Sequence, residues 1–281
     1  CTSCLLNAEE TYVKARQGEV QVLADSDKII LKSAQSHVKK TAKHKFYDRV
    51  DSIFPNIPRS RTEIMPIIAG NKISTELRIS NSEPPILMGR AASFVVNIQC
   101  FCREGVCFKQ KSYQLRPNDH IAVNVSDDLP TNGDPGHLQT GSCWIEMKPL
   151  DDGYIGFTRP HFLIRSQRGT SSLHTQFVSS QHSIFNSARI NRRECQFISY
   201  VNAEDRPVKV SFTVRPVNSA FQEAESSCTL VPYGAKVIPI PELLNPTESY
   251  YRRIECWADG ATRRHLIISD TDFDQVSIDH L

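Results

Sequence analysis

Apolar and polar residues alternate in short runs over most of the chain after about residue 67. Clusters of Gly, Pro, Asn and Asp bound these runs, which are Phe94–Ile98, Ile121–Val125, Tyr154–Phe157, Phe162–Ile164, Phe197–Val201, Val208–Val214, Val237–Ile240 and Leu266–Ile268. Short alternating runs predict strands, and no helical stretch among them is long enough to connect parallel strands. We therefore expect an all-β fold of antiparallel sheets, in the sandwich class.

Two stretches of the chain share five landmarks in the same order, and each stretch contains one of the two tryptophans. The landmarks are Leu115-Arg-Pro117 and Leu230-Val-Pro232, Val123 with Val125 and Ile238 with Ile240, Cys143-Trp144 and Cys256-Trp257, Arg159–Ile164 and Arg263–Ile268, and Leu173-His174 and Asp279-His280. An offset of roughly a hundred residues is too long for a solenoid repeat, so it predicts two tandem domains.

The repeat leads us to expect three regions: an N-terminal extension at 1–65, a first β-sandwich at 66–178 and a second at 179–281. The pattern resembles immunoglobulin-like accessory modules, which implies a fold but no particular activity. We expect each tryptophan, Trp144 and Trp257, to fill the space between the two sheets of its sandwich.

The extension contains the chain's one concentration of positive charge. Apolar residues at helical spacing from Ala34 to Ile53 predict an amphipathic helix, and its other faces are basic. Its candidate partner contacts are Lys39, Lys40, Lys43, Lys45 and Arg49. The helix could lie on an anionic surface, but its apolar stripe favours packing against the first sandwich.

Composition narrows the class of protein. The chain has 281 residues, of which 40% are apolar and 23% charged, with a net charge of +2. These values are typical of a globular protein and make a nucleic-acid partner unexpected. The sequence has no apolar run of about 18 residues, so no transmembrane segment is expected.

The first residue, Cys1, is followed by Thr2 and Ser3. One interpretation is a lipid-anchored bacterial protein, which favours an envelope or extracellular location. The preferred interpretation is a boundary left by cleavage. Among the nine cysteines, Cys102 and Cys107 are placed to face each other across a hairpin, where they could form a disulfide.

The most suggestive residues for chemistry are four histidines at matching repeat positions: His161, His174, His265 and His280. Imidazole is a common ligand of divalent metals, so these four are candidate ligands and the basis of a metal-dependent hydrolase hypothesis. No carboxylate recurs beside them in both repeats, so a structural role is preferred and no metal or other cofactor is predicted.

Catalytic signatures such as a nucleophile elbow, a phosphate-binding loop or H-E-x-x-H do not occur. The main hypothesis is therefore a non-catalytic structural or protein-interaction protein, binding a protein partner or copies of itself within a larger assembly. Tyr250 and Arg252 are further candidate partner contacts. A glycan-binding module that uses Tyr and Trp on loops is the alternative.

Overall fold

The computed structural model describes residues 60–81, 92–130, 138–151, 160–175, 182–189, 193–217, 224–241 and 250–281. In this part of the chain all regular structure is β, in sixteen strands. The predicted helix with its basic residues (Lys39, Lys40, Lys43, Lys45 and Arg49), the N-terminal Cys1 and the run Tyr154–Phe157 lie outside the described residues.

The strands of the first half are β1 (Arg61–Ala69), β2 (Ser74–Ser80), β3 (Phe94–Cys102), β4 (Cys107–Leu115), β5 (His120–Asn124), β6 (Gln139–Pro149), β7 (His161–Ser166) and β8 (Gly169–His174). Those of the second half are β9 (His182–Arg189), β10 (Glu194–Asn202), β11 (Val208–Pro216), β12 (Ala224–Leu230), β13 (Ala235–Pro239), β14 (Tyr250–Ala258), β15 (Thr262–Asp270) and β16 (Val276–His280).

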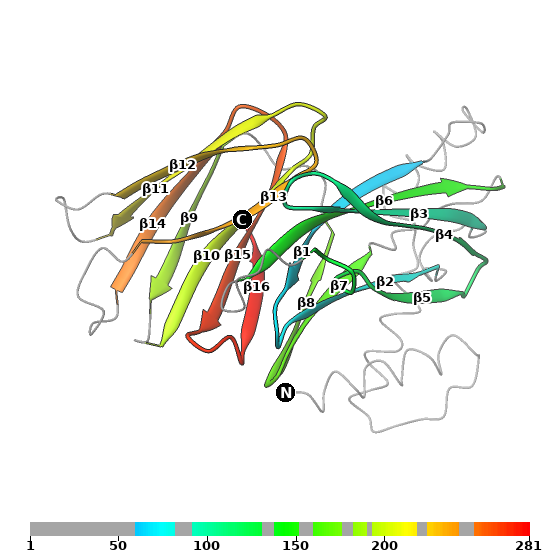
Figure 1. Ribbon diagram of the computed structural model, residues 1–281, viewed down its shortest axis with the longest axis horizontal. Helices are drawn as coiled ribbons and strands as arrows, with labels where there is room; N and C mark the ends of the chain where they lie inside the picture. Colours follow the sequence, from blue (N-terminus) through cyan, green and yellow to red (C-terminus); the bar gives the residue numbers. More distant parts are fainter. Residues whose placement is uncertain are drawn as a thin grey trace, which may run out of the picture.

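These strands form four antiparallel sheets of four strands each (Figure 1). Sheet I has the order β1-β6-β3-β4 and sheet II the order β5-β2-β7-β8. Sheet III has the order β13-β10-β15-β16, and sheet IV, counted from β9, has the order β9-β14-β11-β12. Strand β1 thus corresponds to β9, β2 to β10, and so on through β8 and β16. We call β1–β8 the first unit and β9–β16 the second unit.

The two sheets of each unit share a hydrophobic core. One buried cluster joins the inward faces of sheets I and II, and a second joins those of sheets III and IV. Alternating strands bury one face in this way, so the predicted antiparallel, sandwich-class fold is confirmed. Within the described residues no helix is long and apolar enough to cross a bilayer.

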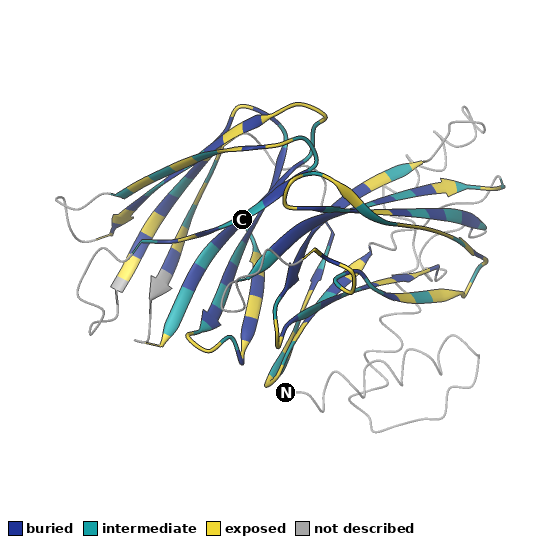
Figure 2. Cartoon of the chain, in the orientation of Figure 1, coloured by how far each residue is buried: buried dark blue, intermediate teal, exposed yellow. Residues whose placement is uncertain are grey.

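The units also pack against each other, through the outward face of sheet III. Ile267, Val276 and Ile278 belong to the core cluster of the first unit, and Val201 contacts the cluster that contains Ile64 of β1. Strand β1 is therefore buried on both faces from Glu63 to Ala69, and buried residues also run along the adjoining part of β6 (Figure 2). Double burial gives β1 a continuous apolar run instead of an alternating one.

Two expectations about the strands need adjustment. Strand β1 begins at Arg61, so the boundary expected after residue 65 lies inside a strand. The predicted runs left out several strands, among them the polar edge strands β4 and β12, in which many residues are exposed. The apolar runs that fall within β3, β5, β7, β10, β11, β13 and β15 were predicted correctly.

Candidate functional site

Both tryptophans lie on central strands, but neither fills the space between the sheets of its sandwich. Successive residues of a strand point to opposite faces. The buried Cys143 and Cys256 point inward, so Trp144 and Trp257 point outward. The expectation of a tryptophan core was therefore wrong by one residue in each repeat.

The outward face around Trp144 is covered by the second unit. Tyr233, in the turn between β12 and β13, stacks on Phe101 with ring centroids 5.1 Å apart and meets Trp144 edge-on, also at 5.1 Å. The Ser142 hydroxyl donates a hydrogen bond of 2.5 Å to the backbone carbonyl of Tyr233. Trp144 is thus part of a contact between the units.

Glycines allow the backbones to approach closely at this contact. Gly105, between β3 and β4, has a φ of +74°, and a Cβ there would lie 2.1 Å from the carbonyl oxygen of Pro232. Likewise, a Cβ on Gly234 would lie 2.6 Å from the carbonyl oxygen of Arg103. Tyr233 itself has a φ of +59°, so a left-handed turn of the second unit is docked on the first.

The corresponding face of sheet IV is not covered by any described residue. We call it the Trp257 face and define it by the outward-pointing residues His182, Ile184, Asn186, Lys209, Ser211, Thr213, Arg215, Val217, Tyr251, Arg253, Glu255 and Trp257. Four large apolar side chains are exposed on it: Trp257 by 46%, Ile184 by 48%, Val217 by 54% and Tyr251 by 66%. Between them Arg253 and Glu255 form an ion pair at 3.0 Å.

Two partner contacts predicted from the sequence, Tyr250 and Arg252, lie on β14 beside the Trp257 face. Arg252 is fully buried, where its guanidinium donates hydrogen bonds to Gln196 Oε1 and, at 3.3 Å, to the Pro241 carbonyl. Its expected role as a surface contact is therefore wrong, because alternation turns it inward. The backbone of Tyr250 pairs with Arg189 in β14 and β9, and its side chain lies outside the described residues.

The four candidate histidines come together across the two units. His161 and His174 are a cross-strand pair in sheet II, and His265 and His280 are the corresponding pair in sheet III. Their ring centroids form a row, 6.2 Å from His161 to His174, 4.9 Å from His174 to His280 and 5.6 Å from His280 to His265.

A row of this kind does not surround a single point, and the described residues contain no group of three or more metal-ligating side chains that could hold an ion. Burial and the neighbouring His280 and Arg263 hold the pKa of His265 well below its usual value. Burial and His174 also lower the pKa of His161. For His161 and His265 these surroundings favour the neutral imidazole.

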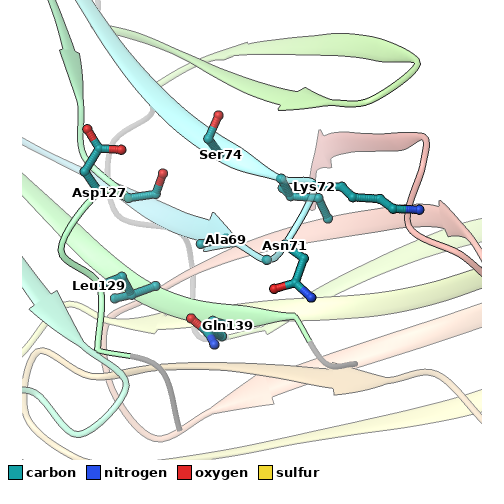
Figure 3. Close-up of a pocket in the computed structure, with 10 residues that line it drawn as sticks. Ala69, Asn71, Lys72, Ser74, Asp127, Leu129 and Gln139 are labelled. Atoms are coloured by element: carbon teal, nitrogen blue, oxygen red, sulfur yellow. The ribbon is translucent and has the colours of Figure 1, made fainter. Parts of the chain in front are cut away.

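An open pocket of about 480 Å³ lies at the turn between β1 and β2 (Figure 3). The described residues that line it include Asn71, Ser74, Asp127 and Gln139 around an apolar floor, and no histidine or cysteine. Lys72 belongs to the lining, but its ammonium is ion-paired with Asp274 of the second unit. The pocket is polar and lacks an imidazole or thiol for acid–base or nucleophilic catalysis.

The described cysteines are all free thiols. Cys102 is buried, whereas Cys107 is exposed and pairs in register with Phe101, so the disulfide expected between these two cysteines is not formed. The sulfur atoms of Cys100 and Cys143 lie 3.9 Å apart in the core of the first unit. The register explains this, because the two residues are opposite each other on β3 and β6.

Comparison with known proteins identifies no family. No family model and no curated protein matches the chain. Solved structures with weak similarity include a β-glucuronidase of Bacteroides uniformis, with 10% identity, a TM-score of 0.22, and coverage of 79% of this chain and 26% of that one. The chain thus spans about a quarter of that enzyme. The T13 IBDV viral particle matches with 8% identity, a TM-score of 0.20, and coverage of 78% of this chain and 72% of that one.

The Trp257 face was not recognised in the sequence, although a signal for it exists. In the run from Tyr251 to Trp257, the residues on the face opposite Cys256 are all large or charged. Had Cys256 been assigned to the core in place of Trp257, alternation would have placed Tyr251, Arg253 and Trp257 together on the outward face.

Proposed function

We propose that this protein is a non-catalytic interaction protein whose Trp257 face binds a protein partner, as one component of a larger assembly. The observation that carries the proposal is that one position has two different environments. Trp144 and Trp257 occupy equivalent positions on equivalent strands, and only Trp144 is covered by a docked turn.

The composition of the Trp257 face supports this role. Trp, Tyr and Arg are the residue types most enriched at the energetic centres of protein interfaces. The face combines Trp257, Tyr251 and Arg253 with the exposed Ile184. Its polar residues suit a partner that binds and dissociates, because non-obligate interfaces are about as polar as the rest of a protein surface.

The finer architecture that we propose is a tandem pair of sandwich modules. The identical strand order of the two units supports duplication. Their order differs from that of an immunoglobulin constant domain, in which the first two strands are neighbours in one sheet. Here β1 and β2 belong to different sheets, so the immunoglobulin-like description applies only to the two-sheet arrangement.

Glycan binding is a second candidate, because two exposed aromatic rings lie on one open sheet face. Tyr251 and Trp257 are both in β14, not on loops as the sequence suggested, and they are about 20 Å apart at ordinary strand spacing. This alternative is tested by titrating the protein with a glycan library while the fluorescence of Trp257 is monitored. A metal-dependent hydrolase is not favoured, because the four histidines form a row and do not surround a point at which an ion could bind.

The test of the main proposal is site-specific photo-cross-linking in the native source. A cross-linking residue replaces Ile184 on the Trp257 face, and in the control it replaces the exposed Lys111 on β4. We expect a discrete cross-linked protein from position 184 only, and its loss when Trp257→Ala is added. Equal cross-linking from both positions, or cross-linking that Trp257→Ala does not change, contradicts the proposal.

A further inference from the structure

The row of four histidines lies where the edges of the two units meet. Strands β8 and β16 are the edge strands of sheets II and III, and they lie side by side. The closest imidazoles of the row, those of His174 and His280, belong to different units and are 4.9 Å apart. Beside them the Ile278 amide donates a 3.1 Å hydrogen bond to the Ser171 hydroxyl. The histidine pair is therefore a direct contact between the units.

The inner end of the row is closed to solvent. His265 is 3% exposed, packs edge-on against Phe162 at 5.9 Å, and its Nδ1 has no hydrogen-bond partner among the described residues. Exposure increases outward, since His280 and His174 are half-buried and His161 is exposed. Protons can therefore reach the outer members without unfolding of the core.

The charged groups around the row disfavour additional positive charge. Arg263 lies two residues before His265 on the same face of β15, and Arg78 is opposite His161 on β2. On β7, Arg165 shares the face of His161, but it pairs with Glu76 at 3.2 Å.

Strands β1, β2 and β16 each carry one carboxylate, and β15 carries Asp270 five residues after His265. Glu76 of β2 is engaged by Arg78 and Arg165. Asp279 alternates to the other face of β16 from His280 and accepts a hydrogen bond from the His280 amide. Glu63 of β1 shares its face with Met65, which packs into the first core.

We propose that the four-histidine row is an acid-sensitive latch between the two units. Neutral imidazoles pack across the β8–β16 junction and hold it closed. Protonation places adjacent cations at the junction, beside Arg263, so the junction opens and the Tyr233 turn separates from Trp144. Acid thereby exposes a second outward-facing tryptophan surface on the first unit.

The direction of the effect follows from linkage. The folded protein holds His161 and His265 at pKa values below those of the unfolded or opened chain. Burial is the main cause for both, with His174 adding to it at His161, and His280 and Arg263 at His265. The opened state therefore binds more protons than the closed state, and the closed state loses stability as pH falls below about 6.5. Above that pH the latch contributes its full stabilisation.

The test uses Trp144 as a reporter, in full-length protein that carries Trp257→Phe. Acrylamide quenching of Trp144 is measured from pH 8 to pH 5, and far-ultraviolet circular dichroism records whether the strands persist. We expect Trp144 to be protected at pH 8 and accessible at pH 5, with strand content retained. In His174→Gln/His280→Gln, protection should extend to lower pH, whereas the exposed His120→Gln on β5 serves as the matched control and should leave the midpoint unchanged.

Two results would overturn the latch: protection of Trp144 down to pH 5, or a transition whose midpoint is the same with and without the junction histidines. If strand content is lost at the same pH at which Trp144 becomes quenched, and this midpoint is the same in all variants, the result also contradicts the latch. Should the double variant be open at pH 8, the single half-buried His174→Gln gives the same comparison. The latch proposal is independent of the proposed partner, because Trp144 quenching is measured on the isolated chain.

Discussion

The outward faces of sheets I and IV have the same strand order and the same central tryptophan, yet the first is covered around its tryptophan and the second is exposed there. Their difference lies in the neighbours of the tryptophan. The register places Phe101 and Ser142 beside Trp144, and Thr213 and Glu255 at the corresponding positions beside Trp257. The first face offers a ring and a hydroxyl to the Tyr233 turn, and the second offers shorter or charged groups. The two faces thus share their strand order and differ in the side chains that flank the tryptophan.

The interiors of the two units differ in the polar groups that they bury. The first unit buries Glu63, Thr75 and Asn81 beside its apolar core. The second holds two buried arginines, Arg252 and Arg264, and the buried Tyr200, whose pKa is raised because burial disfavours its ionised form. Arg264 donates hydrogen bonds to the Ser183 hydroxyl at 2.7 Å and to the Cys256 carbonyl at 3.3 Å. Buried guanidinium groups with hydrogen-bond partners thus distinguish the interior of the second unit.

The largest loss of stability is expected at Gly105, where the covered face has no room for an additional atom. Gly105→Ala puts a Cβ against the Pro232 carbonyl at a left-handed backbone position, so it should reduce the free energy of unfolding by about 3 kcal/mol. Gly169→Ala is the control, because a Cβ there has no atom within 4 Å. Denaturant titration measures both; equal stability of the two variants would show that the β3–β4 turn does not dock on Pro232.

Truncation of the two tryptophans compares the faces directly. Trp144→Ala removes a ring packed against Phe101 and Tyr233 and should cost about 2 kcal/mol of stability. Trp257→Ala removes a half-exposed ring and should cost less than about 0.5 kcal/mol. Chemical denaturation of both variants checks this, and similar losses would mean that something covers Trp257 in the isolated chain.

A smaller difference in stability is expected between variants of the inward-pointing Arg252 and the outward-pointing Arg253 of β14. Arg252→Ala leaves the Gln196 and Pro241 oxygens without their donor and should cost about 1–2 kcal/mol. Arg253→Ala breaks only an exposed ion pair with Glu255 and should cost less than about 0.5 kcal/mol. Thermal unfolding of the pair tests the assignment; a greater loss in Arg253→Ala would reverse the faces of the strand.

The sequence allowed the all-β, antiparallel fold class and seven of the strands to be predicted, because alternation and turn residues are local signals. Even the turn is repeated in detail, since Asn118 and Tyr233, one residue after Pro117 and Pro232, both have positive φ. The four histidines were identified as matching pairs, and their meeting across the units was not, because it depends on how two edge strands are docked.

The orientation of the tryptophans could not be predicted for a related reason. The pair Cys143-Trp144 contains two residues that are both buried to some degree, one by the core and one by the second unit. When both faces of a strand are covered, hydrophobicity no longer distinguishes inward from outward. Only the exposed copy, Cys256-Trp257, shows the true phase of the alternation.

The most direct test of the central claim uses the two tryptophans as probes in single-tryptophan variants at pH 8 and submicromolar concentration. Trp144→Phe leaves only Trp257, and Trp257→Phe leaves only Trp144, since the chain has no other tryptophan. We predict that Trp257 emits at longer wavelength and is strongly quenched by acrylamide, whereas Trp144 emits at shorter wavelength and is protected. Equal emission and equal quenching of the two would contradict the account, because equivalent positions would then have equivalent environments.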